Sequence, residues 1–268
     1  MIAAALFRHL VRRQGAFLGV SALLLTLFQF LICAAVSSTN AGDALETLVR
    51  SLPPAVQNLI ATQFFGGFSE RGLVAFGWNH PVAHALGTAA AIVLASRAVA
   101  GEIESGAVEL LLSQPFSRAT YFFTHVLFAL VALGLLALAG IAGTSLGQVV
   151  FHLPLFGGGP LLRLGLAYFL LLCAWFGLTL AFSSVGQEGG RVAGIGFLLA
   201  LGSFFAQGIG LLWSDASFIL PWTVHHYFSP QTLLLGEGAS LRSCFTLLAV
   251  AVVGMTIAAW RFWRRDLP

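Results

Sequence analysis

The chain has 268 residues, of which 58% are hydrophobic and 9% are charged. A water-soluble domain carries roughly 25% charged residues, so the composition excludes a soluble globule and favours a helical membrane protein. The 13 cationic side chains are all arginine, against 10 carboxylates. Without lysine the chain has no Walker A motif and no Schiff-base chemistry, and no basic patch indicates nucleic acid.

Several apolar stretches are about as long as the roughly 20 residues that cross a hydrocarbon core. We therefore expect an all-α, polytopic membrane protein with a single transmembrane domain over residues 1–268. The six expected membrane-spanning helices cover residues 16–36, 81–100, 121–150, 161–184, 192–212 and 243–262.

The segments between the spans differ in character. Residues 1–15 alternate arginine with apolar residues, which is typical of an amphipathic helix on a membrane surface. Residues 37–79 and 213–242 contain too many charged residues and prolines to span, and we expect both outside the cytoplasm. Trp78, just before the second span, is expected at the membrane interface.

Six crossings place both termini on one side of the membrane, and the arginines indicate which side. Nine of them fall on the side of the termini and four on the other: Arg8, Arg12, Arg13, Arg97, Arg118, Arg191, Arg261, Arg264 and Arg265 against Arg50, Arg71, Arg163 and Arg242. The positive-inside rule then predicts cytoplasmic termini. The three cysteines lack metal-ligand spacing and predict neither a disulfide framework nor a zinc site.

The loop over residues 101–118 holds an acidic cluster and is expected in the cytoplasm. On a helix, Glu102 and Glu109 would lie on nearly the same side, next to an apolar arc that includes Leu110 and Leu111. Pro115 ends this helix. From the residues alone, the loop is either a docking surface for a protein or a solvated acidic turn that keeps two helices apart.

The same loop carries a family resemblance. Glu102-x-Glu104-x-Gly106, followed by Glu109-Leu-Leu-Leu-Ser-Gln-Pro115-x-Ser117-Arg118, resembles the signature of ABC-2 type transporter permeases, especially the branch containing the permease of the nitrous oxide reductase maturation system. The family often has Arg at the positions of Gly101 and Ile103 and Thr at that of Ala107, so this chain departs from the pattern there.

The resemblance implies a coupling helix that seats in a groove of a separate ATPase subunit. The residues that it assigns to ATPase coupling are Glu102, Glu104, Gly106, Glu109, Leu110, Leu111, Pro115, Ser117 and Arg118. It further implies an exporter in the bacterial cytoplasmic (inner) membrane, with two permease protomers, identical or not, and two ATPase subunits. The partner ATPase would bind ATP and Mg, and this chain would hold no catalytic residue and no cofactor. An alternative is a mechanical transmitter to a periplasmic partner of a metalloenzyme-maturation system.

An enzyme is the third hypothesis, because Gly143-Thr-Ser145-Leu-Gly147 fits the G-x-S-x-G pattern of a serine hydrolase. The pattern requires a strand-to-helix turn, whereas these residues continue an apolar helix, so close helix packing explains the glycines better.

Histidines on the predicted outer side offer a metal hypothesis. His80 and His84 share a helix face with metal-ligand spacing, although no carboxylate completes a recognisable ligand pattern. His125, near the inner end of the third span, is expected to bond a backbone carbonyl.

Overall fold

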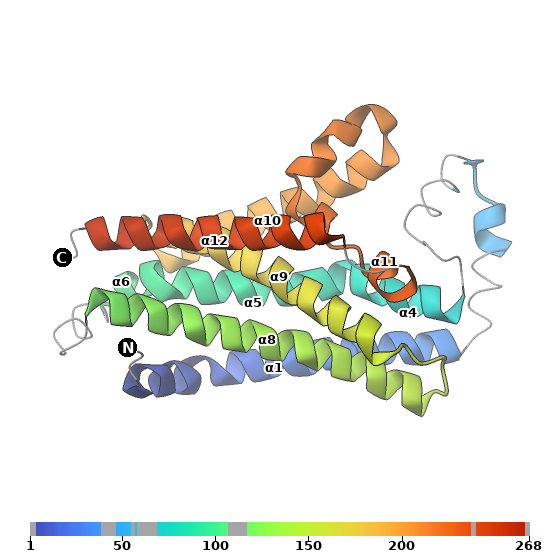
Figure 1. Ribbon diagram of the computed structural model, residues 1–268, viewed down its shortest axis with the longest axis horizontal. Coiled ribbons are helices and arrows are strands. Elements are labelled where there is room, and N and C mark those ends of the chain that lie inside the picture. Colours follow the sequence, from blue (N-terminus) through green and yellow to red (C-terminus); the bar gives the residue numbers. More distant parts are fainter. Residues whose placement is uncertain are drawn as a thin grey trace.

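In the computed structural model, residues 4–38, 47–54, 57, 69–106, 117–236 and 240–265 are described. Within them, six helices are long and apolar enough to cross a membrane, which confirms the all-α, polytopic fold. These helices form an elongated bundle with both ends of the chain at one end of it (Figure 1). The elements are α1 (Ala4–Ser37), α4 (Glu70–Asn79), α5 (Pro81–Ser96), η1 (Arg97–Gly101), α6 (Glu102–Glu104), α8 (Arg118–Val150), α9 (Gly158–Ser183), α10 (Gly189–Leu212), η2 (Ser214–Trp222), η3 (Val224–Tyr227), α11 (Pro230–Leu235) and α12 (Leu241–Arg264).

Helix α1 continues without a break through the expected surface segment and the first span. No proline interrupts it, and a Cβ on Gly15 would meet no other atom within 4 Å. Its first turns already pack on the bundle: Leu10 is buried, and the Phe7 ring meets that of Phe128 on α8 edge-on with centroids 5.6 Å apart.

The second span begins earlier than the sequence indicates. Residues 70–79, expected in an outer loop, form α4, and the candidate span runs from Glu70 to Glu104. Trp78 points into the protein rather than toward a membrane surface: it is fully buried, and its Nε1 donates to the Thr144 hydroxyl at 3.0 Å. The sequence predicts one or two amphipathic helices within residues 37–79, but Glu70 and Arg71 at the start of α4 lower the local hydropathy, which is why hydropathy does not place this helix in the second span.

Close helix approach at glycines holds the bundle together. Thr26 of α1 donates its hydroxyl to the Ala139 carbonyl of α8 at 2.9 Å. A Cβ on Gly143 would lie only 2.3 Å from the Thr26 carbonyl oxygen, so glycine alone allows this contact. Gly254 of α12 and Gly177 of α9 meet in the same way, with a Cβ on Gly254 lying 2.4 Å from the Gly177 carbonyl carbon.

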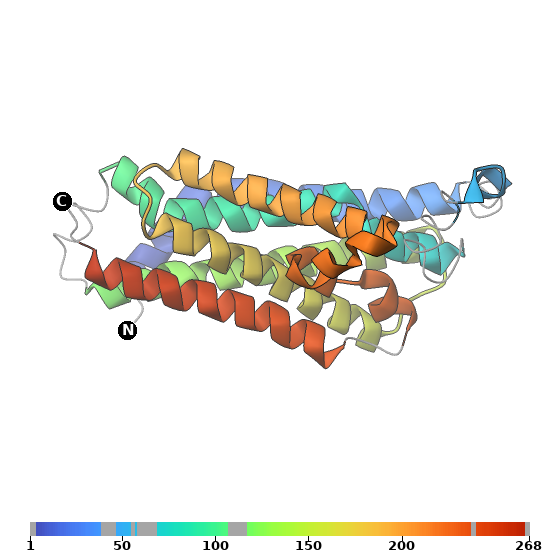
Figure 2. The same cartoon turned by 90° about the horizontal axis from the view of Figure 1, so that it is seen from above.

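Helix α9 lies in the centre of the bundle (Figure 2). The outer helices expose large apolar side chains. On α10, the side chains of Phe197, Leu198, Leu201 and Phe205 are exposed. Such faces require either lipid or another protein against them.

Replacing Gly143 tests the packing of α1 on α8. We expect Gly143→Ala to destabilise the protein by about 1–3 kcal/mol, because the added methyl group cannot fit against the Thr26 backbone. Thermal unfolding of the purified protein in detergent measures the effect. The control is Gly19→Ala on α1, where a Cβ meets nothing within 4 Å; it should be neutral or stabilising by up to about 1 kcal/mol. Equal melting temperatures for the two variants would contradict the packing argument.

Candidate functional site

Near its end, the second span changes from the α-helix α5 to a π-helical turn, η1, which leads into α6. In a regular helix the Ala100 N–H would donate to the Ser96 carbonyl four residues earlier. Here the Ser183 hydroxyl of α9 lies between them, accepting from Ala100 N at 3.0 Å and donating to Ser96 O at 3.2 Å. A side chain inserted between these groups distorts a helix, and η1 is the resulting π turn, a feature frequent at functional sites. We call residues 96–106 the loop root.

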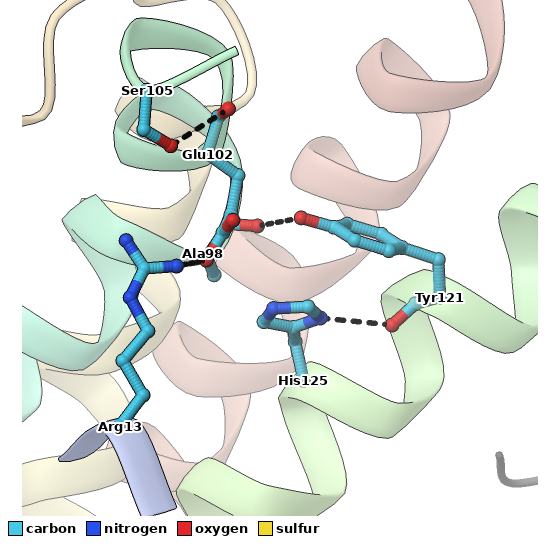
Figure 3. A network of polar contacts seen from close by, with 6 residues as sticks. All are labelled: Arg13, Ala98, Glu102, Ser105, Tyr121 and His125. Carbon is cyan, nitrogen blue, oxygen red and sulfur yellow. Dashed lines mark hydrogen bonds and ion pairs between the residues drawn. The ribbon is translucent and has the colours of Figure 1, made fainter. Parts of the chain in front are cut away.

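Glu102 occupies the interior of the loop root. Its side chain is 2% exposed, and Oε1 pairs with Nη1 of Arg13 on α1, whose own side chain is 37% exposed (Figure 3). The other carboxylate oxygen, Oε2, has no hydrogen-bond partner among the described residues. The pair therefore ties α1 to the loop root.

This placement differs from the one expected from the sequence. Glu102 does not present its carboxylate to solvent as part of an exposed acidic edge, because it is buried against Arg13 on the neighbouring helix. In this structure Glu102 positions the loop root through its pair with Arg13, and its contact with an ATPase stays a prediction.

Helix α8 joins the loop root through Tyr121. Its hydroxyl donates to the Ala98 carbonyl at 2.9 Å (Figure 3). Its ring stacks on Phe262 of α12 with centroids 5.7 Å apart. One turn further along α8, His125 Nδ1 lies 3.1 Å from the Tyr121 carbonyl oxygen, as the sequence predicts. The loop root thus contacts α8, and through Tyr121 it also reaches α12.

Helix α10 begins directly on the loop root. Glu104 is exposed, and its Oε2 accepts a hydrogen bond at 2.8 Å from the backbone N–H of Gly189, the first residue of α10. A carboxylate is favourable at a helix N-terminus because of the unpaired N–H groups there. A Cβ on Gly189 would lie 2.9 Å from the Gly101 Cα, so the two backbones approach more closely than other residues allow.

The remaining described residues of the predicted coupling set lie at the two ends of the loop. Gly106 has a φ of 70°, a left-handed conformation that favours glycine. Ser117 caps α8 by accepting from Thr120 N at 3.0 Å. Arg118 donates to the Arg265 carbonyl at 2.8 Å, and Arg265 in turn donates to the carbonyls that follow α9.

Glu109, Leu110, Leu111 and Pro115 lie outside the described residues, and their contact with an ATPase stays a prediction. Sequence reasoning missed Arg13 and Ser183, two of the long-range partners of the loop root. The pairing of Arg13 could have been suspected from the sequence, since a cation at the start of an apolar helix is a natural counter-charge for an acidic cluster expected on the same side of the membrane. Nothing in the sequence distinguished Ser183, because serine is common in apolar helices.

The two histidines of the metal hypothesis have different surroundings. His80 Nδ1 accepts from Val82 N at 3.2 Å and caps α5. His84 is buried, and its ring lies 5.0 Å from that of His225. Within the described part of the chain, no group of three or more His, Cys, Asp or Glu could hold a metal ion.

Ser145 lies half-buried within the continuous helix α8. The strand-to-helix turn that a nucleophile elbow requires is therefore missing at this position. Close packing accounts for the flanking glycines, since a Cβ on Gly147 would lie 2.6 Å from Cys33 Cβ on α1.

Comparison with known proteins gives one match. The family model described as ABC-2 family transporter protein matches residues 2–267. No curated protein and no solved structure matches the chain.

The buried ion pair predicts an asymmetry between its two members. Arg13→Ala leaves the Glu102 carboxylate buried without a counter-charge and should cost about 3–5 kcal/mol. Glu102→Gln leaves an arginine that can reach solvent and should cost about 1 kcal/mol. We therefore expect thermal unfolding to rank Arg13→Ala below both Glu102→Gln and the double variant. Arg12→Ala is the control, because Arg12 is an exposed arginine next to Arg13, and it is Arg13 that pairs with Glu102. A double variant no more stable than Arg13→Ala would argue against the pair.

Because the Ser183 hydroxyl bonds two backbone groups of the π turn, we expect its removal to loosen that turn locally. Ser183→Ala leaves the Ala100 N–H and the Ser96 carbonyl without their shared partner, at a cost of about 1–3 kcal/mol. Amide hydrogen exchange over residues 96–101 should accelerate. Ser184→Ala is the matched control, because the Ser184 hydroxyl donates to Ala181 O within its own helix segment. If both variants exchange alike, Ser183 does not hold the π turn.

Proposed function

This chain belongs to the ABC-2 transporter family and is a multi-pass permease of an ABC transporter; on that premise we propose that separate cytoplasmic ATPase subunits drive export through it. The observation that carries this proposal is the loop root, which contacts α1, α8, α9 and the start of α10. Movement of the loop can therefore reach four helices at once.

The arginine distribution supports an orientation in the bacterial cytoplasmic membrane with both termini inside. The loop root lies at the same end of the bundle as the termini (Figure 1). In this orientation the loop of residues 101–118 faces the cytoplasm, where ATP is available to an ATPase partner. ATP and Mg would bind to the ATPase subunits, in line with the absence of lysine and hence of a Walker A motif from this chain.

The exposed apolar faces support an assembly of two permease protomers with two ATPase subunits. Because α1 and α10 expose apolar side chains along their length, a second protomer, identical or related, has a surface on which to pack. We propose that ATP-driven closure of the two ATPase subunits pushes on both loops and separates the outer ends of the helices.

A second candidate function is mechanical transmission to a periplasmic partner. The element η2, outside the candidate spans, carries Phe218 and Trp222, whose side chains are 71% and 87% exposed. Large exposed aromatic residues are typical of binding surfaces. A periplasmic protein that co-purifies with the complex would favour this function over export.

Gly106 gives a test of coupling that spares the bundle. A β-branched residue at its φ of 70° is strained by about 1–2 kcal/mol, equivalent to roughly tenfold weaker association with the ATPase. The tagged chain, purified from membranes of its source cell, should bring down an ATPase whose binding and activity fall in Gly106→Val. Gly106→Asn should retain both, because asparagine tolerates this conformation.

The control for this test is Gly190→Ala at the start of α10, where a Cβ meets nothing within 4 Å. It should leave binding and ATPase activity unchanged. Absence of any co-purifying ATPase from the wild type, with Gly106→Val indistinguishable from it, would sink the coupling proposal.

A further inference from the structure

A groove of about 410 Å³ lies between α1 and α8, which run side by side along the bundle (Figure 1). Apolar side chains and glycines line it, among them Leu18 of α1 and Leu135 of α8. The edge-on contact between the rings of Phe7 and Phe128, both part of the lining, joins its two walls near the start of α1. Such a lining requires an apolar occupant.

Two glycines of α1, Gly15 and Gly19, keep the groove open. Both line it, and a Cβ added to either would meet no other atom within 4 Å. They differ from Gly143, whose missing Cβ lets the backbones of α1 and α8 touch. Glycine weakens a helix interior relative to alanine, and contacts with the described residues do not account for these two. They leave space for an occupant from outside the chain.

Two arginines lie on the same side of α1 as these glycines. Spacings of four, three and four residues place side chains in one row along a helix, and the row here consists of Arg8, Arg12, Gly15 and Gly19. Both arginines are exposed, and neither makes an ion pair within the part of the chain that the structure describes. No carboxylate lines the groove. The groove therefore has uncompensated positive charge beside the end at which α1 begins.

The length of the groove beyond the arginines matches one leaflet of a bilayer. Ala22 is the last residue of α1 in the lining, and from Arg12 to Ala22 an α-helix advances about 15 Å. This is about half of a hydrocarbon core of roughly 30 Å. Arginine side chains extend toward the membrane surface while their alkyl stems lie against apolar groups. The guanidinium groups are thus at the depth of lipid phosphates when the apolar part of the groove lies among acyl chains.

We propose that the groove binds an acyl chain of an anionic phospholipid whose phosphate pairs with Arg8 and Arg12, in the leaflet on the side of the termini. Arginines near a membrane surface attract anionic lipids, whereas the positive group of a zwitterionic lipid offsets this attraction. The exposed side chains of Leu24 and Leu31 lie on the opposite side of α1, so a lipid in the groove leaves that side free for protein contacts. The proposal concerns lipid binding and does not depend on coupling to ATP.

The molecule contains a comparison site without arginine. A pocket of about 260 Å³ between α5, α10 and η3 is lined mostly by apolar side chains, including Phe197 and Leu201, and by no arginine or carboxylate. It should take acyl chains without regard to the charge of the headgroup. The two sites therefore separate headgroup recognition from partition into an apolar surface.

Photolabelling of the full chain, purified with any subunits that accompany it, tests the proposal in nanodiscs of phosphatidylcholine. The two probes are trace phosphatidylglycerol and trace phosphatidylcholine that carry the same diazirine-bearing acyl chain, with labelled residues mapped by mass spectrometry. In the wild type, phosphatidylglycerol should label the α1–α8 groove at least several-fold more than phosphatidylcholine. Unlabelled phosphatidylglycerol should compete, whereas glycerol 1-phosphate, which has the charge but no acyl chain, should not. The α5–α10 pocket should show no preference.

Variants assign the two parts of the site. Arg8→Gln combined with Arg12→Gln should abolish the preference for phosphatidylglycerol while labelling by phosphatidylcholine persists. The matched control is Arg261→Gln combined with Arg264→Gln, which removes the same charge from exposed positions on α12 and should keep the preference. Gly15→Leu combined with Gly19→Leu fills the groove and should reduce labelling by both lipids.

Three results would overturn the proposal. The first is equal labelling of the wild-type groove by both lipids. The second is a preference that survives in the Arg8 and Arg12 variant, or that falls equally in the α12 control, because the cause would then be the net charge of the protein. The third is a groove that neither lipid labels, together with a disulfide between two copies of Gly19→Cys that the wild type does not form; this would assign the groove to a second protomer.

Discussion

The hydroxyl of Ser183 stands between two backbone groups, the Ala100 N–H and the Ser96 carbonyl, that have no water to bond inside an apolar bundle. Leaving a backbone group unpaired in such surroundings is unfavourable, so this interaction fixes the π turn of the second span. The turn sets the direction in which Glu102 and Glu104 leave the helix. Their partners, on α1 and at the start of α10, follow from that direction, and with them the attachment of the loop to the bundle.

Hydropathy was sufficient to predict the spans, because a helix that crosses a membrane must be apolar over most of its length. It could not predict α4, whose first two residues are charged although Val74 and Trp78 are buried. The acidic loop was recognisable because carboxylates are rare in this chain. The inward turn of Glu102 was not, since its partner is 89 residues away in the sequence and only the packing of α1 brings them together.

Several polar side chains inside the bundle share one pattern. They bond backbone carbonyls of facing helices: Thr26 bonds Ala139, Tyr121 bonds Ala98 and Tyr168 bonds Ala83. Each bond satisfies a buried hydroxyl and adds a contact between helices, which in an apolar environment is a main source of association. His84, Trp175 and Thr179 depart from this pattern, since both ring nitrogens of His84, the Nε1 of Trp175 and the Oγ1 of Thr179 have no hydrogen-bond partner among the described residues.

Helix α1 has 34 residues and, at about 1.5 Å per residue, is roughly 50 Å long, whereas a hydrocarbon core is about 30 Å thick. A helix of this length must tilt or extend beyond the core, and its tilt follows the thickness of the bilayer. Because Arg13 near its first end is bound to Glu102, any change of tilt acts on the attachment of the loop. The acyl-chain length of the surrounding lipid is therefore a variable that assays of this permease must hold constant.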